Sequence, residues 1–143
     1  MNKQKRITLS LIFLLIFGAC NNAYAGYIDL NRIIKIESNG NSKAYNKHSG
    51  ARGLCQITKI CLKEWNNFHK SERYTMDDLW NIEINKKIAT WYLEVRIPQM
   101  LKYYGFKVNY KNTIICYNAG IDYLVKHKAL KKETSDYIKK YEK

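Results

Sequence analysis

The sequence lacks the features that would divide it into separate domains. It contains no repeat, no low-complexity tract and no linker, and Pro98 is its only proline. No segment has the length and alternation of a long β-strand. The 143 residues are 46% hydrophobic and 13% aromatic, well above a disordered composition and sufficient for one core. The sequence therefore indicates a single, mostly helical domain with a small β-hairpin or loop region near residues 45–55.

A metal-binding pattern is also missing. There is no Cys-x-x-Cys pair, and the three histidines are scattered along the chain, so no zinc signature is present. Beyond the N-terminal region, Cys55, Cys61 and Cys116 allow at most one disulfide, and the sequence leaves its pairing open. Burial as small hydrophobic residues is the alternative. None of the three lies in a motif with an activating base, and we expect no metal and no organic cofactor.

The first 25 residues have the pattern of a secretory signal peptide. A basic start precedes an apolar run over residues 9–17, and Ala23-Tyr24-Ala25 forms a small-x-small cleavage site. The apolar run is too short for a comfortable membrane span. A lipoprotein site ending at Cys20, with a lipid anchor there, is the alternative. We expect an exported protein of the periplasm or cell envelope, whose mature domain covers residues 26–143.

Positive charge dominates the mature chain. The full sequence has a formal net charge of +13, and residues 1–25 carry three basic and no acidic side chains, so about +10 remains after their removal. This excess favours an anionic partner. A carboxylate-bearing polymer of the cell envelope fits an exported protein better than nucleic acid, for which no recognisable reading motif is present. Because the lysines are spread along the chain, solubility alone is the competing explanation.

Helical periodicity predicts the first two elements. A helix over residues 29–38 ends at Asn39-Gly40, and a second helix follows Thr58, a suitable N-cap. The polar, glycine-containing segment between them suits a loop or a hairpin. The second helix is expected to bury a stripe formed by Ile57, Ile60, Cys61, Trp65 and Phe68.

Three further segments follow. The longest predicted helix spans residues 81–96, and Pro98 either kinks it or begins a new turn. Residues 113–117 are too apolar for a surface helix and should lie in the core. A last helix begins near residue 134. The expected inner faces are Ile84, Ile88, Trp91, Tyr92 and Val95 in the long helix and Tyr137, Ile138 and Tyr141 in the last one.

Glu37 occupies an unusual position. It follows Ile33 by four residues and Ile34 by three, so it continues the apolar stripe of the first predicted helix. A carboxylate in such a place must be paired or must hold its proton more tightly than an exposed one. Taken alone, the position favours a solvated glutamate at a helix end, and a functional carboxyl is the alternative that the following motifs support.

Glu37 belongs to the first of four short motifs that follow one another along the chain. They are Glu37-Ser38, then Gly50-Ala51-x-Gly53-Leu54-x-Gln56-Ile57, then Tyr117-Asn118-Ala119-Gly120, and finally Glu133-Thr134-x-x-Tyr137-Ile138. Together they resemble the lysozyme-like lytic transglycosylases of bacterial cell walls, which include the catalytic domain of soluble lytic transglycosylases and small accessory enzymes of secretion and conjugation machines. The resemblance covers about residues 27–142. Cys55 stands where the family usually has Met, and Cys116 where Ala or Val is common.

The resemblance implies a mostly α, lysozyme-like (α+β) fold and a single catalytic carboxylate. In the family one Glu, here Glu37, protonates the leaving oxygen of the MurNAc-β-1,4-GlcNAc bond and then deprotonates the C6 hydroxyl of the same muramic acid. That hydroxyl attacks C1, which forms a 1,6-anhydro sugar. A second carboxylate is not needed, and Asp77, Asp78 and Asp122 lie outside the matched motifs. The implied substrate-binding residues are Ser38, Gln56, Tyr117, Asn118 and Tyr137.

Other interpretations stay open at this point. The chain could be a hydrolytic lysozyme that uses an acidic residue outside the motifs, or a peptidoglycan-binding assembly factor without activity. Gln56 could be a cap between hairpin and helix, and Tyr117 and Tyr137 could be core aromatics. The expected partners are peptidoglycan glycan strands and an envelope-spanning secretion or conjugation machine, with no nucleic acid, and we expect a monomer.

Overall fold

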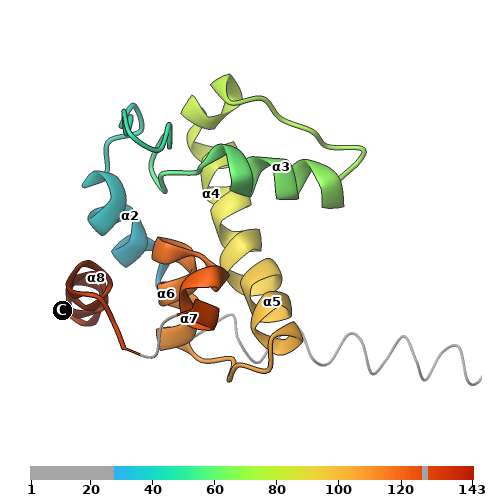
Figure 1. The fold of residues 1–143 in the computed structure, drawn as a ribbon. Coiled ribbons are helices and arrows are strands. Elements are labelled where there is room, and N and C mark those ends of the chain that lie inside the picture. Colours follow the sequence, from blue (N-terminus) through green and yellow to red (C-terminus); the bar gives the residue numbers. More distant parts are fainter. Residues whose placement is uncertain (1–27, 127–128) are drawn as a thin grey trace, which may run out of the picture.

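The computed structural model describes residues 28–126 and 129–143, and the predicted signal peptide and Cys20 lie outside them. The described chain is mostly helical, as predicted (Figure 1). None of its helices is long and apolar enough to cross a bilayer. The elements are α2 (Leu30–Ser38), α3 (Lys59–Phe68), η1 (Asp77–Trp80), α4 (Ile82–Trp91), η2 (Tyr92–Arg96), α5 (Ile97–Tyr103), α6 (Tyr110–Ala119), α7 (Ile121–Lys126) and α8 (Lys132–Glu142).

Side-chain caps set the starts of α2 and α3. Asp29 accepts from the amide of Asn31 at α2, and Thr58 accepts from the amide of Cys61 at α3, as its sequence position predicts. At the other end of α2, Asn39 adopts the left-handed conformation with φ 51°. The Asn-Gly pair therefore ends α2 directly after Glu37-Ser38.

The elements α4, η2 and α5 form one long helical column through the molecule (Figure 1). In its middle, η2 is a π-helical turn in which the amide of Ile97 donates to the carbonyl of Tyr92. Pro98 follows in the first turn of α5. Because proline lacks an amide hydrogen and crowds the preceding turn, a wider π-turn accommodates it without ending the helix. Pro98 thus alters the winding of the column, and the chain continues along it to Tyr103.

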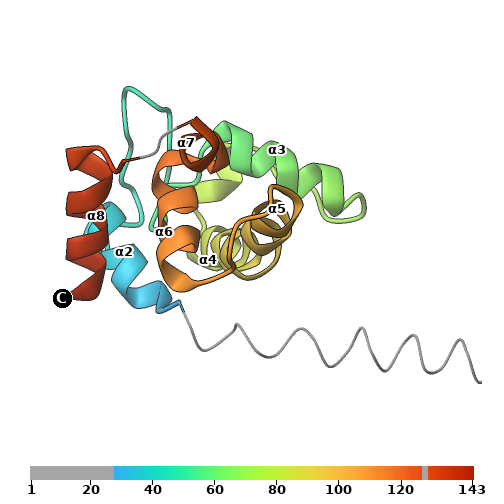
Figure 2. The same cartoon turned by 60° about the horizontal axis from the view of Figure 1, so that its bottom comes forward.

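The core divides into two hydrophobic clusters at opposite ends of this column. The α3 cluster contains Leu54, Cys55, Ile57, Cys61, Leu62, Trp65, Leu79, Ile88 and Ala89. The α6 cluster contains Ile33, Leu93, Ile97, Met100, Leu101, Ile114, Ile115, Cys116, Tyr123, Tyr137, Ile138 and Tyr141. Tyr92 packs against both. Figure 2 shows α6 between the pair formed by α2 and α8 and the lower end of the column at α5.

Two predicted inner faces were partly wrong. Ile60 is 72% exposed and Phe68 is 54% exposed, because α3 packs on the core through Cys61, Leu62 and Trp65. Val95 is 40% exposed, since the π-turn adds a residue to its turn and shifts the face that the column presents there. Residues 113–116 are buried, as predicted, and residue 117 is only partly buried. Tyr137, Ile138 and Tyr141 form the inner face of α8, also as predicted.

The predicted hairpin or loop region near residues 45–55 is a loop with two isolated antiparallel bridges. Arg52 pairs with Tyr45 on one side and with Ile57 on the other. The amide of Gly53 also donates to the carbonyl of Ala44. This loop, hereafter the 41–57 loop, connects α2 to α3 and lies on the α3 cluster through Leu54, Cys55 and Ile57.

Candidate active site

A cleft of about 480 Å³ brings the separated motifs together. Its walls come from the end of α2, the 41–57 loop, the start of α3, the π-turn η2, the end of α6 and the start of α8. The lining residues are Glu37, Asn46, Ser49, Ala51, Gln56, Ile57, Thr58, Ile60, Cys61, Tyr92, Cys116, Tyr117, Asn118, Ala119, Gly120 and Glu133. The cleft therefore lies where the α3 cluster meets the α6 cluster.

Glu37 is half-buried in this cleft at the last turn of α2. The Tyr137 hydroxyl donates a hydrogen bond of 2.5 Å to its Oε1. Burial raises the pKa of Glu37, and the hydrogen bond from Tyr137 lowers it to a smaller extent. The net pKa is above the usual value for a glutamate, as the apolar stripe of α2 predicts. A carboxyl group in this state suits proton donation near neutral pH.

Tyr137 reaches Glu37 from α8, one hundred residues further along the chain. It is buried in the α6 cluster, and burial together with the neighbouring Glu37 charge raises the pKa of its hydroxyl. The hydroxyl therefore stays protonated and acts as a donor. Tyr137 was expected to bind substrate; the structure places it against the candidate acid, outside the residues that line the cleft.

Gln56 adopts a left-handed backbone conformation with φ 50°. Its side-chain amide Nε2 donates to the carbonyls of Ala44, at 3.1 Å, and Gly53, at 3.0 Å. The donor end of Gln56 thus holds the 41–57 loop together, and Oε1 is the atom left for a ligand in the cleft. Both the binding role and the capping role considered from the sequence are compatible with this placement.

Tyr117 and Asn118 lie at the end of α6, on the wall of the cleft opposite the 41–57 loop. The Tyr117 hydroxyl donates to the carbonyl of Cys55 at 2.6 Å, which ties α6 to the 41–57 loop across the cleft. Burial raises the pKa of this hydroxyl well above its usual value. Asn118 is exposed. Ser38 donates to the carbonyl of Ile34 within α2 and is outside the cleft lining.

Asn85 is a site-supporting residue that the sequence patterns did not single out. It is fully buried in α4, where its Oδ1 accepts from the amide of Cys55 at 2.9 Å. Its Nδ2 donates to the carbonyls of Arg52 and Leu79, each at 2.9 Å. The one hint in the sequence is its position, because Asn85 is a polar residue three positions before Ile88 on the inner face of a predicted helix. Asn85 therefore fixes the loop that carries Gln56.

Gly53 lies directly against this asparagine. A Cβ atom at Gly53 would come within 2.3 Å of Nδ2 of Asn85 and 2.5 Å of the carbonyl oxygen of Leu79, and its φ is +77°. A side chain is excluded both by space and by backbone conformation. The glycine that the motif contains is thus required where the loop meets α4.

Glu133 is a second carboxylate in the cleft. It is exposed in the first turn of α8 and lines the cleft together with Glu37. The sequence marked it only as part of the last motif. Asp77, Asp78 and Asp122, which lie outside the matched motifs, are absent from the cleft lining.

The three described cysteines are free and buried. Burial raises the pKa of Cys55 and of Cys116 to about 12 and also raises that of Cys61. Thiols with such pKa values are poor nucleophiles near neutral pH. The single disulfide that the sequence allows is not formed among these residues. Within residues 28–126 and 129–143, no group of three or more His, Cys, Asp or Glu side chains could hold a metal ion.

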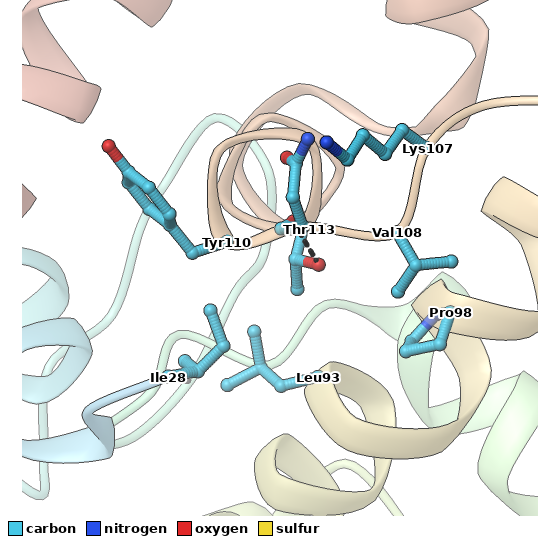
Figure 3. Close-up of a pocket in the computed structure, with 8 residues that line it drawn as sticks. Ile28, Leu93, Pro98, Lys107, Val108, Tyr110 and Thr113 are labelled. Atoms are coloured by element: carbon cyan, nitrogen blue, oxygen red, sulfur yellow. Dashed lines mark hydrogen bonds between the residues drawn. The ribbon is translucent and has the colours of Figure 1, made fainter. Parts of the chain in front are cut away.

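A second, smaller cavity of about 220 Å³ lies apart from these motifs (Figure 3). Apolar side chains dominate its lining, and Lys107 is its one charged side chain. The hydroxyl of Thr113 points into the same region and donates to the carbonyl of Asn109. Because this cavity contains no carboxylate and none of the predicted site residues, the larger cleft is the candidate active site.

Comparison with protein families agrees with the geometry of the cleft. The family model described as Transglycosylase SLT domain matches residues 22–140. The match confirms the resemblance and the lysozyme-like, mostly helical fold predicted from the sequence. No curated protein matches the chain.

Proposed function

Because the chain belongs to the transglycosylase SLT domain family, a family of lytic transglycosylases that act on peptidoglycan, we propose that it cleaves the MurNAc-β-1,4-GlcNAc bond and leaves a 1,6-anhydro-MurNAc end. One observation carries this proposal. The cleft contains a half-buried carboxyl group, Glu37, whose pKa is raised by burial. Such a group holds the proton that departure of the glycosidic oxygen requires.

Glu37 acts first as an acid and then as a base. In the first step it gives its proton to the glycosidic oxygen, the bond from C1 to that oxygen breaks, and positive charge develops at C1. In the second step the Glu37 carboxylate takes the proton of the C6 hydroxyl of the same MurNAc, and O6 bonds to C1. The first proton leaves on the departing sugar and the C6 hydroxyl supplies a new one to Glu37, so the reaction consumes no water and needs no second carboxylate.

The neighbours of Glu37 divide into positioning and binding groups. Tyr137 donates to Oε1 and fixes the orientation of the carboxyl, so it is a positioning residue. Tyr117 holds the end of α6 against the loop through Cys55, and Asn118 faces the cleft beside it. We assign Asn118 and Oε1 of Gln56 to substrate hydrogen bonds. Ser38 bonds its own helix, so a binding role would require it to turn away from Ile34.

Hydrolysis of the same bond is the second candidate. It is favoured by one observation, the presence of Glu133 in the cleft with Glu37, because lysozymes of the two-carboxylate type use a pair of acidic residues. In that case Glu133 would activate or replace the attacking water. The product would carry a reducing end, heavier by one water than the anhydro end.

Mass spectrometry of digested peptidoglycan tests these assignments. Anhydro-muropeptides from the wild type and none from Glu37→Gln are expected, while Glu133→Gln and the exposed control Glu83→Gln keep the anhydro product. Reducing-end products that disappear in Glu133→Gln would instead establish the lysozyme. Wall binding without any product from the wild type would support the non-catalytic assembly factor.

We also propose the cellular setting that the sequence favours. Residues 1–25 direct export, lipidation of Cys20 being the alternative, and the mature protein works as a monomer in the periplasm or cell envelope. Its substrate is the peptidoglycan glycan strand, and an envelope-spanning secretion or conjugation machine is the protein partner.

A further inference from the structure

A basic hollow of about 530 Å³ lies between α2 and α8, apart from the cleft. All but one of its described lining residues are cationic, and none of them is acidic. They are Arg32, Lys35, Ile36, Lys140 and Lys143. None belongs to the four motifs found in the sequence, and no function described above uses them.

The lysines of the basic hollow have no acidic partner among the described residues. No ion pair within residues 28–126 and 129–143 includes Lys35, Lys140 or Lys143, and all three are exposed. Arg32 is exposed too, and its Nε lies 3.6 Å from Oδ2 of Asp29. Exposed cations gathered in one depression create a positive potential that attracts a polyanion.

The basic hollow and the cleft lie toward opposite ends of the antiparallel pair formed by α2 and α8. The amide of Asp29 donates to the Tyr141 hydroxyl at 2.7 Å, and Nη1 of Arg32 donates to the Tyr141 carbonyl at 2.6 Å. The start of α2 therefore lies against the end of α8 (Figure 2). The cleft lies where α2 ends and α8 begins, at Glu37 and Glu133.

Charge also distinguishes the two depressions. The described lining of the cleft has two acidic side chains, Glu37 and Glu133, and no lysine or arginine, the reverse of the basic hollow. Lys35 precedes Glu37 by only two residues, but it lies about 200° round the helix from it. An anionic surface therefore attracts the basic hollow rather than the cleft, which orients the molecule.

The start of α2 is also where the described domain joins the N-terminal region. Residues 9–17 are the apolar run of the predicted signal peptide, and residues 18–27 separate it from Ile28. Such a stretch spans at most about 35 Å. A bilayer that holds the apolar run, or a lipid on Cys20, therefore lies within reach of the basic hollow.

We propose that the basic hollow docks on the surface of an anionic phospholipid bilayer, with the cleft directed away from it. The lysines are exposed on two helices, so they suit an extended surface of lipid phosphates better than a single enclosed anion. Each lysine or arginine near such a surface strengthens binding about fivefold. Docking goes beyond the proposed function and does not depend on cleavage.

Vesicle binding by the processed chain, residues 26–143, tests the docking. The wild type should sediment with vesicles of equal parts phosphatidylglycerol and phosphatidylcholine and remain in solution with phosphatidylcholine alone. Salt at about 0.5 M should release it, because it screens charges on the surface. The triple variant Lys35→Gln/Lys140→Gln/Lys143→Gln should bind the anionic vesicles about a hundredfold more weakly.

A second triple variant separates the basic hollow from net charge. Lys59→Gln/Lys63→Gln/Lys70→Gln removes the same charge from exposed positions on or near α3 and should bind anionic vesicles like the wild type. Both variants change exposed residues, so both should unfold at the wild-type temperature. Equal losses in the two variants, or a wild type that ignores anionic vesicles or binds neutral ones equally well, would overturn the proposal. So would a basic hollow whose loss weakens binding to purified peptidoglycan alone.

Tryptophan fluorescence tests the orientation. Trp65 and Trp91 pack together in the α3 cluster, with ring centroids 5.5 Å apart, and Trp80 lies 6.5 Å from Tyr45 of the 41–57 loop. Vesicles with brominated acyl chains quench only tryptophans at the bilayer, so docking through the basic hollow should leave the fluorescence unchanged. Quenching on binding would show that the α3 side faces the bilayer and would refute the orientation. Neither measurement involves cleavage, so failure of the proposed function leaves both tests intact.

Discussion

At the scale of single residues, the pKa of Glu37 is set by two opposed contributions. Burial at the end of α2 raises it, and the hydroxyl of Tyr137 lowers it. The first contribution was predictable, because the apolar stripe formed with Ile33 and Ile34 indicated burial. The second joins residues one hundred positions apart, and no local pattern predicts that contact. The sequence therefore predicted the burial of Glu37 but not its hydrogen bond with Tyr137.

Replacing Tyr137 by Phe removes the contribution that lowers the Glu37 pKa, so the pKa rises further. Because the protonated carboxyl is the active form of a general acid, the alkaline limb of the kcat/KM profile should move to higher pH. Loss of the hydrogen bond should also cost about 1 kcal/mol of stability. A pH–rate profile on purified peptidoglycan measures the shift.

Tyr141→Phe is the matched control for this experiment. Tyr141 is buried on the same face of α8, and its hydroxyl accepts from the amide of Asp29 instead of contacting Glu37. Its loss should lower stability by a similar amount and leave the alkaline limb in place. An alkaline limb that moves to lower pH in Tyr137→Phe would contradict the assigned role of Tyr137.

At the scale of elements, the 41–57 loop depends on α4 for its shape. It has isolated bridges and further backbone hydrogen bonds of its own, and a side chain of α4 adds the bonds that join it to the column. Asn85 satisfies one amide and two carbonyls, and Gly53 provides the space that this asparagine fills. Because Gln56 and Ala51 of the same loop line the cleft, the shape of the cleft depends on a buried residue that the substrate does not reach.

Asn85→Ala leaves three buried backbone groups without their partner and should lower the free energy of unfolding by about 3 kcal/mol. Denaturant unfolding measures this loss, and wall-digesting activity should fall with it even where the variant is folded. Asn81→Ala is the control on the same helix, since Asn81 only caps α4 through the amides of Glu83 and Ile84. It should cost about 1 kcal/mol and keep activity. Equal activity of both variants would show that the loop holds its shape without Asn85.

The predicted buried face of a helix was correct where its apolar residues form a single stripe. It was wrong where packing against neighbouring elements decides which apolar residues are exposed. The cap at Thr58 and the core position of residues 113–117 followed from local chemistry. Ile60 and Phe68 were wrongly placed inside because the apolar pattern of α3 extends beyond its buried face. Hydrophobic periodicity does not distinguish a second apolar ridge from the core.

At the scale of the whole molecule, two hydrophobic clusters meet at the cleft and each contains buried thiols. Cys55 and Cys61 belong to the α3 cluster and Cys116 to the α6 cluster. Their pKa values are raised by burial. Cys61 and Cys116 line the cleft and are nearly covered by their neighbours, whereas access to Cys55 requires the α3 cluster to open.

Thiol reactivity should report this opening. In a Cys20→Ser background, an aromatic disulfide reagent at neutral pH should label none of the three cysteines within minutes in the folded protein and all three in denaturant. The absorbance of the released thiolate gives the count. Rapid labelling of Cys55 under native conditions would show that the α3 cluster opens on its own, and rapid labelling of Cys61 or Cys116 would show that the reagent reaches that thiol from the cleft. A count below three in denaturant would reveal a disulfide.

Because of the π-turn at η2, the central column contains one more residue than a regular α-helix of the same length. Since the surplus residue is accommodated within that turn, α4 and α5 keep their rotational phase, and each presents its apolar side to its own cluster. Removing one residue inside α4 would instead rotate everything after it by about 100° and carry Ile97 and Leu101 away from the α6 cluster. Tolerance of insertions and deletions in the column is thus confined to a single turn, and length variation among related chains should be found there.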